Sequence, residues 1–110
     1  MANILHVDAS VVVREAISKA AQMLGHSVVS LASVPDTDQH FENIDLYICD
    51  GEIGVYFDGL LYALEQAENG NKVLILAQRR KFFLLPFLNK DSIRNTDLVQ
   101  KVITEALLAQ

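Results

Sequence analysis

The stretch IDLYICDGEIG, residues 44–54, runs through a mostly apolar segment and ends in an acidic residue followed by glycine. A strand that is buried on both faces has this nearly continuous apolar pattern, which is typical of a parallel sheet covered on both sides. Asp50 therefore falls at the carboxyl end of an expected buried strand, where open parallel sheets gather their ligands. Asp50 is either a reactive carboxylate or a strand-end side chain that caps amides of the following loop.

The segments around this strand alternate between strand and helix patterns. The expected strands lie at residues 4–7, 26–33, 44–49 and 72–78, with a short fifth strand near Phe87 and Leu88. The expected helices lie at residues 10–24, 34–41, 59–68 and 96–108. Strands that alternate with helices at this length imply right-handed crossovers and a parallel sheet. The sequence predicts a single α/β domain over residues 1–110.

The segment RRKFFLLPFLNKDSIRN, residues 79–95, is too short for a full helix plus a strand. We therefore expect an irregular segment and then the short fifth strand. The segment has more apolar residues than one edge strand can bury, so they either fill the core beside a reduced helix or form an exposed patch for a partner or a homodimer. The candidate interface residues are Arg79, Arg80, Phe82, Phe83 and Phe87.

Composition excludes several classes of function. The formal net charge of −5 and the pI near 5.0 argue against a nucleic-acid-binding face, because phosphate backbones recruit Lys and Arg. Cys49 is the single cysteine, so no internal disulfide can form and a reducing compartment is expected. The sequence has no secretory signal pattern and no apolar run of about 20 residues, so we expect a cytoplasmic protein without a membrane span.

Acidic residues follow two expected strands, Asp8 after the first and Asp50 after the third, and Lys90 follows the short fifth strand. With these three residues the whole chain resembles the receiver domain of two-component response regulators. The resemblance implies a flavodoxin-like, doubly wound sheet of five parallel strands and a signalling role without enzyme activity of its own. It also implies that Asp50 accepts a phosphoryl group from a histidine kinase, that Asp8 and Asp50 hold Mg²⁺, and that Lys90 pairs with the phosphoryl group.

The loop DGEIGVYFDG, residues 50–59, is also similar to the loop after the acceptor in receivers. Ile53 and Gly54 stand where that family usually has Met and Pro, and Asp58 and Gly59 come one residue later than usual.

The departures from the family pattern concern the partners of Asp50. Receivers usually have a second acid after the first strand, where this chain has Ala9, and a Ser or Thr at the end of the fourth strand, where it has Ala77. Glu52 either supplies a carboxylate that compensates for Ala9 or is a solvated loop acid. Asp8 is equally open to two interpretations, as a metal ligand or as a helix-cap or turn residue.

The fourth helix of the family is expected to be reduced or missing here. In receivers a Ser or Thr and an aromatic residue on the fifth strand transmit phosphorylation to a docking surface, and Ala77 and Phe87 occupy these switch positions. We therefore expect an atypical receiver that acts by protein contact, with a histidine kinase or a downstream effector as partner. The alternatives are a working Mg²⁺-dependent phosphoacceptor and a fragment of a larger regulator.

The three histidines, His6, His26 and His40, are not expected to form a zinc site. His6 lies on a predicted buried strand, where a hydrogen-bonded core residue is expected.

Overall fold

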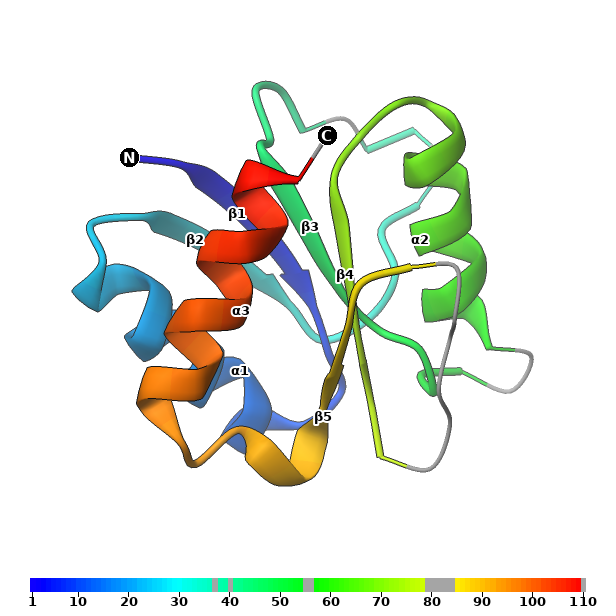
Figure 1. The fold of residues 1–110 in the computed structure, drawn as a ribbon. Helices are drawn as coiled ribbons and strands as arrows, with labels where there is room; N and C mark the ends of the chain where they lie inside the picture. The colour runs from blue at the N-terminus through cyan, green and yellow to red at the C-terminus, as the bar shows by residue number, and fades with distance from the viewer. Residues whose placement is uncertain (37, 40, 55–56, 79–84, 110) are drawn as a thin grey trace.

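The computed structural model describes residues 1–36, 38–39, 41–54, 57–78 and 85–109. These residues form one sheet of five parallel strands with helices on both faces (Figure 1). The strands are β1 (Asn3–Val7), β2 (Ser27–Leu31), β3 (Leu46–Asp50), β4 (Val73–Ala77) and β5 (Phe87–Asn89). The helices are α1 (Val11–Met23), α2 (Asp58–Glu68) and α3 (Thr96–Leu108), and a single 3-10 turn, η1 (Lys90–Ser92), follows β5.

The strands lie in the order β2-β1-β3-β4-β5, so the predicted doubly wound α/β fold is confirmed. The chain moves outward from β1 to β2 and then returns to place β3 on the other side of β1. In this register Val7 of β1 pairs with Cys49 of β3. Asp8 and Asp50, one position further along each strand, therefore lie side by side at the switch point of the sheet.

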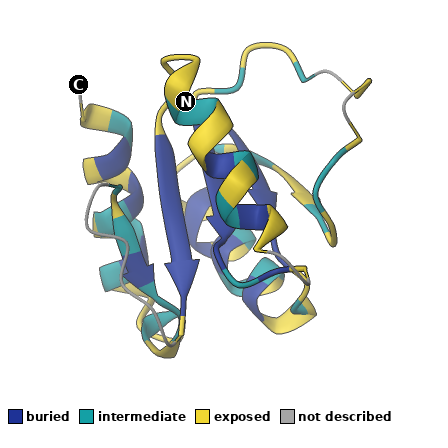
Figure 2. Ribbon diagram, turned by 90° about the vertical axis from the view of Figure 1, so that its right-hand side faces the viewer, coloured by how far each residue is buried: buried dark blue, intermediate teal, exposed yellow. Residues whose placement is uncertain are grey.

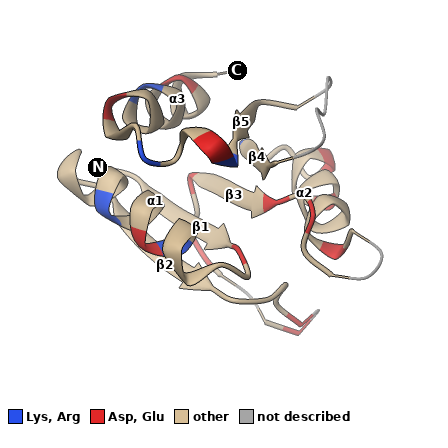
Figure 3. Ribbon diagram, turned by 90° about the horizontal axis from the view of Figure 1, so that it is seen from below, with Lys and Arg blue, Asp and Glu red and all other residues tan. Residues whose placement is uncertain are grey.

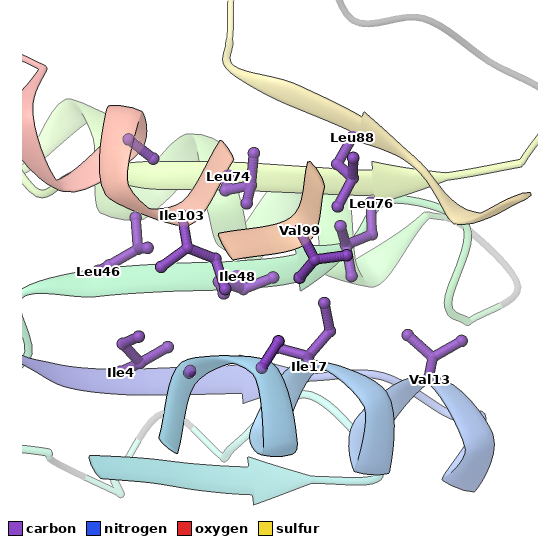
Figure 4. Close-up of a cluster of buried hydrophobic side chains, with 13 residues drawn as sticks. Ile4, Val13, Ile17, Leu46, Ile48, Leu74, Leu76, Leu88, Val99 and Ile103 are labelled. Carbon is purple, nitrogen blue, oxygen red and sulfur yellow. The ribbon is translucent and has the colours of Figure 1, made fainter. Parts of the chain in front are cut away.

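Two apolar clusters fill the two faces of the sheet, because successive residues of a strand point to opposite sides. Helices α1 and α3 cover the first cluster, which Figure 4 shows between them and the strands. Helix α2 covers the second cluster on the opposite face (Figure 1). The central strands are buried, whereas the helices are exposed on their outer sides (Figure 2). Residues from three strands alternate between the faces: Ile4, Leu46, Ile48, Leu74 and Leu76 belong to the first cluster, and Leu5, Tyr47, Cys49, Val73 and Ile75 to the second.

Local side chains set the ends of the two helices on the first face. Ser10 Oγ accepts a hydrogen bond from the amide of Val13 at 3.3 Å and caps α1, as predicted. Asn95 Oδ1 accepts from the amide of Leu98 at 3.1 Å and caps α3. Gly25, the predicted stop of the first helix, follows it with φ of +87°.

The predicted helix at residues 34–41 is wrong. The described residues between β2 and β3 contain no helix and form turns and bends instead. The amide of Gln39 donates to the carbonyl of Asp36 at 3.0 Å, and Gln39 Oε1 accepts from the amide of Asp36 at 3.1 Å. These bonds close a local turn, and the segment has too few regularly spaced apolar residues to hold a helix against the sheet.

Within the described residues no helix lies between β4 and β5, which agrees with the predicted loss or reduction of the fourth helix. Residues 79–84 lie outside the described residues. No helix in the part of the chain that the structure describes is long and apolar enough to cross a membrane.

Candidate functional site

The candidate site lies at the carboxyl edge of the central strands, where Asp8, Asp50 and Lys90 meet. Asp8 is fully buried and Asp50 is 4% exposed. The Lys90 ammonium lies 2.9 Å from Asp50 Oδ2 and 3.4 Å from Asp8 Oδ2, and the Lys90 side chain is 16% exposed. One cation thus bridges two buried carboxylates, and the convergence of these residues follows from the strand order.

Asp8 holds the turn between β1 and α1 as well as facing the site. Its Oδ1 accepts from the amide of Ser10 at 2.9 Å, and its backbone carbonyl accepts from Arg14 Nη1 at 2.6 Å. The cap of α1 is Ser10 and not Asp8. Asp8 is therefore a turn residue whose second carboxylate oxygen is turned toward Lys90.

The two carboxylate oxygens of Asp50 also have different partners, as those of Asp8 do. Oδ1 accepts from the amide of Glu52 at 2.9 Å, and Oδ2 pairs with Lys90. The loop-capping interpretation of Asp50 is thus confirmed for Oδ1, and its role as a reactive carboxylate stays a prediction.

Lys90 reaches this position because β5 ends beside β4. Ala77 of β4 pairs with Asn89 of β5, and Asn89 Oδ1 accepts from the amide of Asp91 at 2.8 Å to cap η1. This short turn places Lys90 at the same edge as the two carboxylates.

His6 belongs to the site, although it was not among the residues predicted there. It is fully buried two residues before Asp8, and its Nε2 lies 3.7 Å from Asp8 Oδ2. The prediction of a hydrogen-bonded histidine is wrong for the described residues, since neither ring nitrogen has a hydrogen-bond partner among them. The period of two along a strand could have shown that His6 and Asp8 share a face.

Burial of Asp8 would raise the pKa of its carboxyl group, but its neighbours act in the opposite direction. Contact with His6, the hydrogen bond from the Ser10 amide and the charge of Lys90 together outweigh burial and lower the pKa below the ordinary value of 3.8. The site thus favours the ionised form of Asp8.

The lowered pKa predicts a specific dependence of stability on pH. A carboxyl group whose pKa is lower in the folded than in the unfolded chain stabilises the fold above the unfolded pKa, and this contribution is lost as the pH falls through the folded pKa. We expect the difference in free energy of unfolding between the wild type and Asp8→Asn to shrink as the pH falls below 3.8. Urea unfolding of both proteins across a pH series measures it, and a difference that is independent of pH would contradict this assignment.

Glu52 and Gln78 form a second contact, between the loops at the same edge of the sheet. Glu52 Oε1 accepts from the backbone amide of Gln78 at 2.6 Å, and Gln78 Nε2 donates to Asp91 Oδ1 at 3.2 Å. These bonds connect the loops that follow β3, β4 and β5. Glu52 is therefore not a free loop acid, because the Gln78 amide holds one of its carboxylate oxygens, and no pattern in the sequence signals this pairing. Its role as a metal ligand stays a prediction.

The predicted switch positions lie beside the site. Ala77 is fully buried at the end of β4 and has no hydroxyl group to offer. Phe87 is partly buried and packs, together with Leu85, against the second apolar cluster. The other candidate interface residues, Arg79, Arg80, Phe82 and Phe83, lie outside the described residues, so the interface at this segment stays a prediction.

Among the described residues no group of three or more His, Cys, Asp or Glu side chains is arranged to hold a metal ion. The carboxylates that face Lys90 at this edge are those of Asp8 and Asp50.

Comparisons with known proteins identify the fold. No protein-family model matches the chain, and no curated protein matches it significantly in sequence. A response regulator from Thermotoga maritima matches in structure with a TM-score of 0.81 and 18% identity over 99% of both chains. A receiver protein from Pseudoalteromonas atlantica matches with a TM-score of 0.77 and 15% identity, covering 96% of this chain and 97% of its own.

The chemotaxis protein CheY4 of Vibrio cholerae matches with a TM-score of 0.72 and 20% identity, covering 96% of this chain and 98% of its own. Such low identities establish the architecture and leave the chemistry to the individual residues. The chain has the fold of response-regulator receiver domains over nearly its whole length.

Proposed function

We propose that this chain is an atypical receiver domain that acts in two-component-type signal transduction by contact with other signalling proteins, with phosphotransfer to Asp50 weakened or lost. The observation that supports it best is the position of Lys90, whose ammonium bridges Asp50 and Asp8. The partner would be a histidine kinase or a downstream effector, and a homodimer is the alternative assembly.

The donors at this edge do not fit a resident Mg²⁺ ion. Magnesium requires nearly ideal octahedral coordination by oxygen and binds where carboxylates are free to face it. Asp8 and Asp50 each use one oxygen for a backbone amide and turn the other toward an ammonium group. Ala9 supplies no ligand, and Glu52 binds the Gln78 amide instead.

The groups that would read a phosphoryl group are altered as well. Ala77 offers no hydroxyl donor, and the amide of the next residue, Gln78, already donates to Glu52. A phosphoryl group on Asp50 would have to disturb this bond to use the amide. The electrostatic stabilisation on which phosphoryl transfer depends would therefore be reduced.

A working phosphoacceptor is the second candidate, and one observation favours it. Asp50, Asp8 and a lysine all meet at the carboxyl edge of the sheet, with Asp50 nearly buried and 2.9 Å from Lys90. The two candidates differ in their response to Mg²⁺ and to a phosphoryl mimic.

Beryllofluoride with Mg²⁺, which mimics an aspartyl phosphate, tests the two candidates by amide NMR. We expect no concentration-dependent shift at Asp50, Ala77 or Lys90 in the wild type. Ala9 lacks the second acidic metal ligand, and Ala77 lacks the hydroxyl donor for the phosphoryl group. Ala9→Asp restores the second acid and is expected to gain a response. A wild-type response that disappears in Asp50→Asn would overturn the proposal and favour the phosphoacceptor.

A further inference from the structure

The charges of this chain are divided along the sequence. No Lys or Arg occurs between Lys19 and Lys72, so all nine basic residues lie outside this stretch. The same stretch contains nine of the fourteen acidic residues: Asp36, Asp38, Glu42, Asp45, Asp50, Glu52, Asp58, Glu65 and Glu68. Figure 3 shows red and no blue segments on α2 and on the described part of the loop after β2. This side of the molecule is therefore acidic.

A hollow of about 560 Å³ lies on this acidic side, between α2 and the loop after β2. We call it the α2 groove. It lies beside the loop that takes the place of the predicted helix at residues 34–41. The apolar and aromatic part of its lining comes from Phe41, Tyr47, Leu61 and Tyr62. Leu61 is 58% exposed and contributes apolar surface to the lining.

Two tyrosine rings form one wall of the α2 groove. Tyr47 and Tyr62 pack edge to face, with ring centroids 6.0 Å apart and an interplanar angle of 66°. Burial raises the pKa of Tyr62, and electrostatic repulsion from Tyr47, Cys49 and Glu65 raises it further. The ring therefore stays neutral at physiological pH. Neutral tyrosine faces attract cations, most strongly from Arg.

Carboxylates complete the lining of the α2 groove. Asp36 lies on the loop, and Asp58 and Glu65 lie on α2 two turns apart. The described lining residues include no Lys, Arg or His. Aromatic rings beside carboxylates suit a long basic side chain, because its alkyl stem packs on the rings while its charged end reaches the acids.

We propose that the α2 groove binds a basic segment of a partner protein, with an Arg or Lys side chain packed on Tyr62 and Leu61 and its charged end at Glu65 or Asp58. The charge complementarity selects this occupant over an acidic or neutral segment. The α2 groove is a separate surface from the Asp50 edge, so its binding goes beyond the role proposed for that edge and does not require phosphotransfer.

A short peptide of alternating leucine and arginine, titrated into the full chain and followed by amide NMR, tests the proposal. We expect shifts at Tyr47, Tyr62 and Glu65 and none at Ala77 or Lys90, with binding that weakens as salt is added. A matched peptide of leucine and glutamate should cause no shift. Equal responses to both peptides, or shifts spread over the whole acidic side, would overturn the proposal.

Two variants on one helix sharpen this test. Glu65→Gln removes a charge from the α2 groove and is expected to lower the affinity for the basic peptide about threefold. The corresponding free energy is within the range measured for exposed ion pairs. Glu68→Gln removes an exposed charge that does not line the α2 groove, and should leave the affinity unchanged. Equal losses of affinity in the two variants would show that only the net charge of the protein matters and would refute the site.

A third variant and a measurement of association complete the test. Tyr62→Leu keeps an apolar side chain but removes the ring, and is expected to lower the affinity for the basic peptide about fivefold. Asp50→Asn should bind normally, which separates failure of this inference from failure of the proposed function. Sedimentation that shows a dimer abolished by Glu65→Gln would make a second copy the occupant and overturn the assignment to a partner protein.

Discussion

Replacing Lys90 with methionine is expected to lower the free energy of unfolding at neutral pH by about 3 kcal/mol. Methionine keeps most of the length of the side chain but removes the ammonium that lies 2.9 Å from Asp50 and 3.4 Å from Asp8. Two buried carboxylates would then face each other without their bridging cation, and the desolvation of both charges would no longer be offset. Urea unfolding of the two proteins measures the difference.

Three comparisons show whether the loss arises from charge. Lys101→Met, on the exposed side of α3, should change stability little. Asp50→Asn in the Lys90→Met background should recover much of the loss, because it removes one of the two unpaired charges. The deficit of Lys90→Met should also shrink as the pH falls through the lowered folded-state pKa of Asp8, because Asp8 then loses the charge that Lys90 pairs with. A deficit that persists unchanged at low pH would assign the role of Lys90 to packing instead.

The convergence of Asp8, Asp50 and Lys90 could be predicted from the sequence because it follows from strand ends. Parallel strands bring their carboxyl ends to one edge, so a residue that follows a buried strand has a nearly fixed place whatever the neighbouring loops do. The apolar pattern of each strand was strong enough to locate these ends. This part of the site required no knowledge of side-chain contacts.

The contacts of Glu52 and Gln78 could not be predicted in the same way. They depend on the conformation of two loops from different parts of the chain, and loop conformation is not encoded in apolar periodicity. The helix expected at residues 34–41 failed for a related reason. Pro35 suggested a helix start, but without an apolar stripe the local side-chain bonds of the segment determined its structure.

The differences from the receiver pattern that the sequence alone revealed are missing side-chain groups. Relative to the receiver pattern, Ala9 and Ala77 lack a carboxylate and a hydroxyl at places that strand ends define, so the absence of these groups could be seen without a structure. The structure adds what the remaining groups do instead, with Lys90 between the aspartates and Glu52 on the Gln78 amide. Together these changes support the proposal that phosphotransfer to Asp50 is weakened or lost.

The second large effect is expected from Gly59→Ala, at the start of α2. Gly59 is buried against the end of β3, and a Cβ atom at this position would overlap the backbone carbonyl of Asp50 and the Cγ2 atom of Ile53. Alanine is normally favoured over glycine within a helix by about 1 kcal/mol. Here we expect a net loss of about 2 kcal/mol, because the backbone of β3 or of α2 must move to relieve the overlap.

Gly70→Ala is the matched control at the other end of the same helix. Gly70 has φ of +85°, and a Cβ atom added there would meet no other atom within 4 Å, so its substitution should cost about 1 kcal/mol through backbone strain alone. Only Gly59→Ala should shift the amide signals of Asp50 and Glu52, because Gly59 and not Gly70 lies against the end of β3. Equal stability losses without such shifts would mean that α2 does not set the position of Asp50. A shift confined to Gly59→Ala would make the close approach of α2 a determinant of the site, and would explain why a glycine follows Asp58 here.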